Sequence, residues 1–470
     1  MKERKSASES KRRIKGGKME TLKKLVSIVN PQRVINPHLF TPPEGFSIDS
    51  RTIKKGEGFI ALRGKHFNGH YFIPEAYHKQ ASLVIAEEES FLKDLRLSCL
   101  VVKDSYQAME KIALYLRKKN NPQVVGIVGS VGKTTTKEMI YFILKDKFCV
   151  KKNEKTENNI LGVCKTIFNL TNHQILILEL GTNSQGEIKK LSTIALPDIG
   201  VVTFIKPTHL EGLGSLEGVF KEKTSLFTVR ENIKGVLNRD DNFLRKVSFL
   251  KNVFWFGLKK QCHIYGQIVK TGLEESLFLV NNNFLLRLKT SAPFFIYNAL
   301  AALSVGELLG IKLKDAVESL SEFNFPPQRY EKVKIDKLIF INDCYNSNPY
   351  SLKEALKVLR EYPLKKIAII GDMLELGKKT AYYHKRISKD ILKAGVDYLL
   401  IMGKYSLYLE KEIKKKGFKD VSYFSSYEGI VDFLKNLSSQ EYLVFIKGSR
   451  SLKMERIISL YQQRMFGVQS

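Results

Sequence analysis

The sequence predicts an α/β protein made of three consecutive blocks of strands and helices. Short buried runs of apolar residues alternate with helix-like segments over most of the 470 residues, which is typical of parallel sheets covered by helices. Two breaks, at 120–122 (Asn-Asn-Pro) and 326–327 (Pro-Pro), interrupt this alternation and are natural domain boundaries. With 43% hydrophobic residues, the chain is long enough to bury more than one core.

The first block, residues 19–120, is predicted to be a small mixed α/β domain. Its apolar runs FIAL, SLVIA and CLVV are expected to be short buried strands with helical stretches between them. Ahead of it, residues 1–18 carry eight Lys or Arg against two Glu, 8 − 2 = +6, and almost no apolar residue. This composition predicts a disordered basic tail. Met19, which starts an amphipathic segment, is an alternative initiator.

The second block, residues 121–325, predicts a central parallel sheet with helices on both faces. Its strands are QVVGIV, ILILEL and IGVVTFI, and a helix is expected from Lys133 to about Lys145. The stretch 250–290 is richer in short β-like runs, so we expect a hairpin excursion there. In the third block, residues 326–470, the runs LIFIND, KIAIIG, YLLIM and YLVFIKG predict buried strands of a further α/β unit.

Composition narrows the class of protein. The five cysteines never have C-x-x-C spacing, so reduced thiols are expected. No apolar run approaches eighteen residues and no signal peptide is visible, which predicts a cytoplasmic protein without a membrane span. The net charge of +29 fits nucleic-acid binding or a lysine-rich surface around anionic substrates. The second interpretation is favoured, because the lysines are spread along the chain without interleaved aromatics.

The clearest motif is GIVGSVGKTTT, residues 126–136, between an apolar strand and a helix. This is the context of a phosphate-binding loop, in which backbone N–H groups and the helix amino end hold phosphate oxygens. Lys133 would reach the β- and γ-phosphates, and Thr134 would ligate Mg²⁺. The longer motif, G-x-x-x-x-G-K-[ST], requires a glycine at position 127, where this chain has Ile127. The match is therefore to the shorter form, G-x-x-G-K-T. The predicted nucleotide-binding residues are Gly129, Ser130, Val131, Gly132, Lys133, Thr134 and Thr135.

Two further candidates follow the next strands of the same sheet. Glu179 ends ILILEL, where a second Mg²⁺ ligand belongs beside a phosphate loop. His209 follows IGVVTFI and emerges at the same edge, so a structural role and a site role are both open. Lys223 would pass for an ordinary surface lysine on its local pattern alone.

A long ordered series of motifs resembles the Mur ligase family over about residues 45–460. The series is DSR from Asp49, ALRGKHFNGHYF from Ala61, GSVGKTT from Gly129, NN at Asn158 and Asn159, ELGTNSQGEI from Glu179, PTHLEGLGSLEG from Pro207, NRDD from Asn238, NDCYNSNPYSL from Asn342, GDMLELG from Gly371 and KGSRSLKMERI from Lys447. GDMLELG and KGSRS resemble the branch that adds D-alanyl-D-alanine. The DNPR-like signature of the branch that adds the third peptide residue is absent.

The resemblance implies an amino-terminal domain for the UDP-sugar, a central ATPase domain and a carboxyl-terminal Rossmann-like domain. It also implies an ATP-dependent ligase that joins D-alanyl-D-alanine to a UDP-muramoyl-tripeptide through an acyl phosphate. That reaction belongs to peptidoglycan precursor synthesis, and hence to cell shape and division. The expected ligands are ATP, Mg²⁺ and these small-molecule substrates, with no nucleic acid, and the expected oligomeric state is a monomer.

The roles of individual residues are also implied by motif position. Lys133, Glu179, His209 and Lys223 are the expected catalytic residues, with Lys223 carbamylated by CO₂. The expected Mg²⁺ ligands are Thr134, Glu179, His209 and Lys223; the remaining ATP contacts are Asn298, Arg329 and Asp343; and the expected substrate contacts are Ser50, Arg51, Asn158 and Asn159.

Three stretches depart from the family pattern, and three rival functions stay open. Thr156 replaces an asparagine, Phe294-Phe295 replaces His-Asn, and Asn68-Gly69-His70 replaces Asp-Gly-His. The first rival is another amide-forming ligase of the same superfamily, such as a folylpolyglutamate synthase or a different branch of the Mur ligases. The second is a basic phosphate-loop NTPase acting on nucleic acid, which predicts steeply salt-dependent binding. The third is a catalytically dead relative, which the retained lysines, glutamate and histidine argue against.

Overall fold

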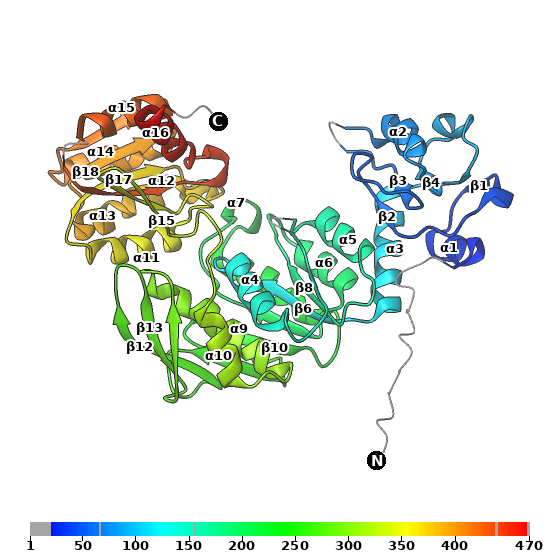
Figure 1. Ribbon diagram of the computed structural model, residues 1–470, viewed down its shortest axis with the longest axis horizontal. Coiled ribbons are helices and arrows are strands. Elements are labelled where there is room, and N and C mark those ends of the chain that lie inside the picture. The colour runs from blue at the N-terminus through cyan, green and yellow to red at the C-terminus, as the bar shows by residue number, and fades with distance from the viewer. Residues whose placement is uncertain (1–19, 65–66, 155–156, 438–439, 468–470) are drawn as a thin grey trace, which may run out of the picture. The chain divides into compact units, whose positions relative to one another are not determined.

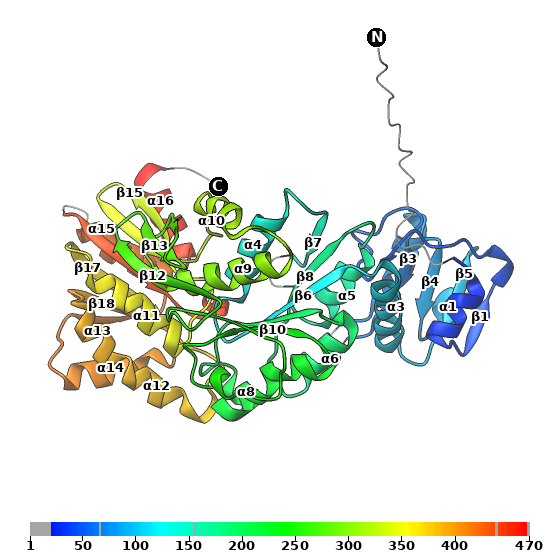
Figure 2. The same ribbon diagram turned by 90° about the horizontal axis from the view of Figure 1, so that it is seen from below.

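A computed structural model describes residues 20–64, 67–154, 157–437 and 440–467 (Figures 1 and 2). The predicted tail at 1–18, Met19 and the departure at Thr156 lie outside the described residues. The chain forms two compact units. The first consists of the described residues up to Val124 together with Lys147–Leu178 and Thr193–Leu196, and the second holds the rest.

The first unit contains a five-stranded sheet in the order β1-β5-β4-β3-β2. Its strands are β1 (Arg33–Ile35), β2 (Phe46–Ser47), β3 (Gly58–Ile60), β4 (Leu83–Ala86) and β5 (Ser98–Val101). All neighbours are parallel except β1 and β5. The helices of this block are α1 (Leu22–Val29), α2 (Ile73–His78) and α3 (Ser105–Asn120). α2 packs on the sheet through Ile73 and Ala76, which join Phe59, Val84 and Cys99 in one core.

A nine-stranded sheet has the order β14-β13-β12-β11-β10-β9-β6-β8-β7. Its strands are β6 (Gln123–Val128), β7 (Val150–Lys152), β8 (Ile175–Glu179), β9 (Ile199–Val202), β10 (Lys234–Asn238), β11 (Val253–Gly257), β12 (Ile264–Thr271), β13 (Ser276–Val280) and β14 (Phe284–Leu288). The pairs from β6 and β9 through β12 are parallel, whereas β12, β13 and β14 are antiparallel. The predicted hairpin excursion is therefore confirmed.

The helices associated with this sheet place the phosphate loop. They are α4 (Lys133–Leu144), α5 (Ile160–Phe168), α6 (Glu187–Ala195), α7 (Leu210–Leu213), α8 (Leu216–Thr224), α9 (Ile296–Leu308) and α10 (Leu313–Ser321). α9 is apolar nearly all round and buried over most of its length, as a helix without a polar face must be. It packs against α4 (Figure 2), so the helix that follows the phosphate loop has a fixed support.

The third sheet has the order β15-β16-β20-β17-β18-β19, parallel except for β15. Its strands are β15 (Glu331–Ile335), β16 (Leu338–Asn342), β17 (Lys365–Gly371), β18 (Tyr398–Met402), β19 (Val421–Phe424) and β20 (Tyr442–Lys447). Its helices are α11 (Pro349–Arg360), α12 (Thr380–Arg386), α13 (Ser388–Ala394), α14 (Ser406–Lys415), α15 (Tyr427–Leu437) and α16 (Arg456–Phe466). α15 and α16 cover one face, and α11 and α13 lie on the other (Figure 1). Strands buried on both faces explain the unbroken apolar runs of the sequence.

Short 3₁₀ turns connect several of these elements. They are η1 (Pro37–Leu39), η2 (Gly69–Phe72), η3 (Glu89–Leu92), η4 (Ser225–Thr228), η5 (Leu244–Lys246), η6 (Pro293–Phe295), η7 (Gly377–Lys379) and η8 (Arg450–Leu452). Each of the three predicted blocks carries one sheet, so the α/β prediction is confirmed. All five cysteines are free thiols, also as predicted. Within the described ranges, no helix has the length and apolar character needed to cross a membrane.

Candidate active site

The phosphate loop connects β6 to α4, as the sequence predicted. Gly132 has a φ of +83°, and a β-carbon at this position would lie 2.2 Å from the amide nitrogen of Asn298. A β-carbon at Gly129 would lie 1.9 Å from the Thr203 hydroxyl. Both glycines are needed because the loop is pressed against its neighbours, and glycine alone has no side chain to collide.

Side chains from neighbouring segments hold the loop in this shape. The Thr203 hydroxyl donates to the Val131 carbonyl at 2.6 Å. The Ser130 hydroxyl donates to the Lys206 carbonyl at 2.8 Å, and the Ser130 backbone N–H donates to Phe204. Asn298 Nδ2 donates to the Gly132 carbonyl at 3.0 Å and to the Thr136 hydroxyl at 2.9 Å. The structure shows Asn298 bracing the loop, whereas its contact with adenine stays a prediction. The Ser130 hydroxyl is occupied by its bond to Lys206.

Lys133, Thr134 and Glu179 lie together at the start of α4. Thr134 Oγ1 donates to Glu179 Oε2 at 2.7 Å, and Glu179 is buried at the end of β8. Lys133 Nζ donates to the Gly129 carbonyl at 3.0 Å, so the lysine folds over the loop. Burial lowers the pKa of Lys133; the charges of Glu179 and Glu375 oppose this shift, and that of Arg329 adds to it. The structure therefore groups a cation, a hydroxyl and a carboxylate at the predicted phosphate position.

Arg329 and Tyr345 add to this group from the start of the third block. The Arg329 guanidinium stacks on the Tyr345 ring, 3.8 Å from its centre. Its buried Nη2 has no hydrogen-bond partner among the residues that the structure describes. Burial and the Glu179 charge raise the pKa of Tyr345, while hydrogen bonds with Thr134 and Arg329 oppose the rise. An oriented guanidinium with an unused donor beside Lys133 suits a phosphate oxygen. The sequence pointed to Arg329 but missed Tyr345, which lies inside the NDCYNSN motif.

The Asp343 carboxylate forms an ion pair with Lys447 and accepts a hydrogen bond from the Tyr330 backbone. Lys447, buried at the end of β20, places Nζ 2.6 Å from Asp343 Oδ2 and 2.9 Å from the Asn346 carbonyl. The Tyr330 backbone N–H donates to Asp343 Oδ1 at 3.2 Å. Lys447, which carries the first position of KGSRS, therefore fixes the loop that bears Tyr345. Its motif was visible in the sequence, but its partner was not.

Replacing Lys447 with methionine is expected to destabilise the chain by about 3 to 5 kcal/mol, because removing one member of a buried ion pair leaves the other charge uncompensated. Urea unfolding of the full chain measures this. The control is Lys365→Met at an exposed position of β17, which should change stability by less than about 0.5 kcal/mol. Equal unfolding midpoints for the two variants would contradict the assigned role of Lys447.

His209 precedes α7 in a left-handed conformation, with a φ of +52°. Its Nδ1 lies 2.6 Å from Glu375 Oε2, although the contact lacks the direction of a hydrogen bond. This contact lowers the pKa of Glu375, with a smaller contribution from the Lys133 charge; burial opposes the shift. Glu375 belongs to GDMLELG, and no local pattern distinguishes it from the other residues of that motif.

Lys223 is not the surface lysine that its local pattern suggested. It lies in α8, and its side chain is only 1% exposed. Burial lowers its pKa well below the usual range; the Lys133 charge lowers it further, and Glu222 opposes the shift. A lowered pKa favours the neutral amine, which is the form that reacts with CO₂.

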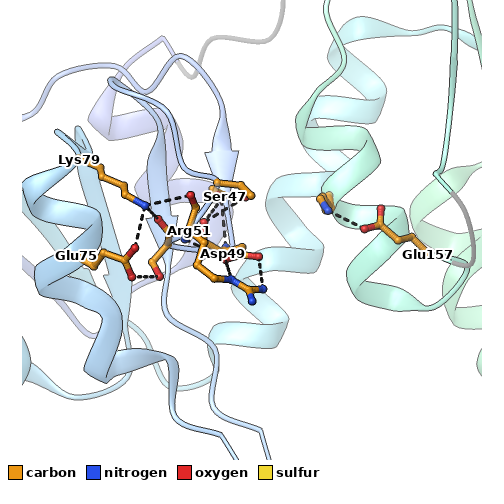
Figure 3. Close-up of polar contacts among 9 residues, drawn as sticks. Ser47, Asp49, Arg51, Glu75, Lys79 and Glu157 are labelled. Atoms are coloured by element: carbon orange, nitrogen blue, oxygen red, sulfur yellow. Dashed lines mark hydrogen bonds and ion pairs between the residues drawn. The ribbon is translucent and has the colours of Figure 1, made fainter. Parts of the chain in front are cut away.

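Arg51, one of the predicted substrate residues, lies in a polar network with Asp49, Glu75 and Lys79 (Figure 3), and Ser50 belongs to the same network. Arg51 binds Asp49 through two nitrogens, at 2.9 and 2.7 Å, and its side chain is 81% exposed. The Ser50 hydroxyl donates to Glu75 Oε2 at 2.6 Å, and Lys79 Nζ donates to the Ser50 carbonyl at 2.8 Å and to Glu75 Oε1 at 2.8 Å. Glu75 and Lys79 were not predicted, because they come from α2 and its end, well after DSR in the sequence.

The other predicted substrate residues and two of the departures have local structural roles. Asn159 caps α5 by accepting a hydrogen bond from the Gly162 N–H at 3.0 Å. Asn68 caps η2, and His70 Nε2 accepts from the Glu87 N–H at 2.9 Å. The side chain of Phe294 contacts Tyr330 edge-on, with 5.9 Å between ring centres. Asn158 is half-buried just before α5.

The sequence of the chain matches three domain models of one protein family. Residues 44–125 match the Mur ligase family catalytic domain, 127–306 the Mur ligase middle domain and 328–450 the Mur ligase glutamate ligase domain. The chain is 32% identical to UDP-N-acetylmuramoyl-tripeptide–D-alanyl-D-alanine ligase of Rickettsia prowazekii over 434 residues, covering 88% of this chain and 94% of that protein.

Solved structures agree with the sequence match. A crystal structure of MurF from Acinetobacter baumannii has a TM-score of 0.85 at 25% identity, covering 94% of this chain and 98% of that one. MurF ligase from Thermotoga maritima, in complex with ADP, has a TM-score of 0.80 at 25% identity, covering 92% and 99%. The family matches run from residue 44 to residue 450, and a relative at 32% identity covers 88% of the chain. The chain therefore belongs to the Mur ligase family.

Proposed function

We propose that the chain is an ATP-dependent ligase that joins D-alanyl-D-alanine to a UDP-N-acetylmuramoyl-tripeptide in peptidoglycan precursor synthesis. The observation that supports this most is that the chain covers 94% of the Rickettsia prowazekii relative whose name describes that reaction. GDMLELG and the start of KGSRS also lie within the part of the chain that matches the family.

The reaction brings two anions together, the tripeptide carboxylate and the γ-phosphate of ATP. The enzyme must stabilise the negative charge that shifts between them during phosphoryl transfer. The terminal carboxylate of the tripeptide attacks the γ-phosphate of ATP, giving ADP and an acyl phosphate. The amine of D-alanyl-D-alanine then attacks the acyl carbon, phosphate leaves, and an amide forms with loss of a proton. Lys133 and the unused Nη2 of Arg329 supply fixed positive charge at this position, and preorganised charge of this kind is the main catalytic term for phosphoryl transfer.

The residues present fit Mg²⁺. Thr134 and Glu179 offer a hydroxyl and a carboxylate oxygen 2.7 Å apart, and Mg²⁺ prefers oxygen ligands shared with substrate phosphates. When bound, the ion would supply positive charge that offsets the charge of the phosphate groups. Among the described residues, no group of three or more His, Cys, Asp or Glu forms a metal cluster. His209 and a carbamylated Lys223 are the proposed residues for a second ion.

Carbamylation of Lys223 is proposed because its amine is buried and its pKa is lowered by that burial. The amine nitrogen adds to the carbon of CO₂ and loses one proton, which converts a base into an anionic oxygen ligand. Such an anion would also offset the positive charge of Lys133, whose proximity lowers the Lys223 pKa.

We place the reaction in the cytoplasm, where ATP and UDP-linked precursors are available. We also propose that one chain suffices, since Lys133, Glu179, His209, Lys223 and Arg329 all belong to the same compact unit. The net charge of +29 then serves to attract phosphorylated substrates rather than nucleic acid.

Phosphate release from ATP tests this function. With UDP-muramoyl-tripeptide and D-alanyl-D-alanine both present, release should be fast and should match formation of the pentapeptide product. Omitting either substrate should lower the rate to background. Release that ignores D-alanyl-D-alanine but rises with another amine, or with DNA or RNA, would instead support one of the rival functions.

A further inference from the structure

The GDMLELG loop, residues 371–377, is docked on the segment that carries His209. The Glu375 carbonyl accepts a hydrogen bond from the Glu211 N–H at 3.2 Å, and a β-carbon on Gly377 would lie 3.2 Å from the Glu211 Cα. Glu375 and His209 both have positive φ, at +63° and +52°. Strained backbone at two facing non-glycine residues is characteristic of functional sites. The contact therefore places the Glu375 carboxylate beside the phosphate-transfer residues.

Glu375 is the carboxylate that an incoming solute can reach. Two carboxylates, Glu179 and Glu375, act electrostatically on Lys133. Glu179 is 2% exposed and already accepts a hydrogen bond from Thr134. The Glu375 side chain, in contrast, is 51% exposed. Of the two, only Glu375 can take a new partner without breaking the phosphate loop.

His209 contacts Glu375 at one carboxylate oxygen, Oε2, and lowers the pKa of that carboxyl. His209 Nδ1 is 2.6 Å away, but the carboxylate oxygen lies off the direction in which a ring N–H would point. A carboxylate gains most from a directed, charged N–H donor. The geometry thus leaves a place for a cationic nitrogen next to Lys133 and His209.

We propose that Glu375 binds the primary ammonium group of the incoming D-alanyl-D-alanine, an inference that rests on the proposed function. The acceptor amine must approach the acyl carbon while the phosphate is held by Lys133 and Arg329. The Glu375 carboxylate can hold the ammonium there and so orient it. The ammonium then loses one proton to solvent water, and the neutral amine attacks the acyl carbon with its lone pair. The role assigned to Glu375 is binding and not removal of the proton.

The test uses Glu375→Gln in the full chain, which keeps the size of the side chain and removes its charge. The KM for D-alanyl-D-alanine should rise by about 10- to 100-fold, because a charge-assisted hydrogen bond is lost. The KM for ATP should stay within about twofold, because uniform nucleotide binding is untouched. The matched control is Glu211→Gln, an exposed carboxylate on α7, which should leave both constants unchanged.

Hydroxylamine separates a binding role from a structural one. It is an uncharged nucleophile at neutral pH and needs no ammonium site, so Glu375→Gln should form hydroxamate from ATP and UDP-muramoyl-tripeptide at the wild-type rate. An unchanged KM for the dipeptide, or an equal loss of hydroxamate formation, would overturn the proposal. If the wild-type chain forms neither hydroxamate nor pentapeptide, the proposed function itself fails, which is a different outcome.

Discussion

Lys133→Ala is expected to lower ATP-dependent phosphate release by about 100- to 1,000-fold, the loss seen when a preorganised charge at a transition state is removed. Lys133 lies at the first position of α4, and its Nζ folds over the phosphate loop at Gly129. The loop itself is held by Thr203, Ser130 and Asn298. The variant should therefore keep the shape of the loop and still bind ADP, with weaker affinity.

The control for this prediction is Lys145→Ala, at the exposed far end of the same helix. It removes the same charge without touching the loop and should retain full activity. ADP binding by calorimetry would show whether Lys133→Ala still forms the nucleotide site. Full turnover in Lys133→Ala would refute the assignment of this loop to ATP.

The sequence predicted those parts of the site that local pattern determines. A strand, a glycine loop and a helix follow one another in the chain, so Gly129–Thr135 could be placed without any tertiary information. Glu179 could be placed because carboxyl ends of parallel strands meet at one sheet edge. The α/β class followed from apolar runs that are buried on both faces, as in β17 and β20.

The residues that escaped prediction depend on contacts between segments far apart in the sequence. Tyr345 matters because it stacks on Arg329 and reaches Thr134, about two hundred positions earlier in the chain. Glu375 meets His209 only because the GDMLELG loop docks beside α7. Lys223 has the local pattern of a surface residue, and only the fold shows that it is buried. Periodicity cannot reveal such pairings, and motif resemblance marks the segments without saying which atoms meet.

Lys223→Ala is expected to reduce ligation by about 100-fold or more, because the chain loses the proposed anionic oxygen ligand beside the phosphate site. Alanine cannot carry a carbamate, but it leaves space where the buried side chain was. A short carboxylate such as formate or acetate should enter that space and restore part of the rate. Initial rates measured against carboxylate concentration give this recovery directly.

Two comparisons make the Lys223 result specific to carbamylation. Lys221→Ala, on the exposed side of the same helix, should keep full activity and show no response to formate. Buffer depleted of CO₂ should slow the wild-type chain, and bicarbonate should reverse the loss, whereas Lys223→Ala should respond to neither. An unchanged rate in Lys223→Ala would mean that its burial serves packing alone. Lys223→Ala could instead lose activity that no carboxylate restores, while the wild-type chain is insensitive to CO₂. That result would mean that the buried amine acts unmodified and that no carbamate holds a second ion.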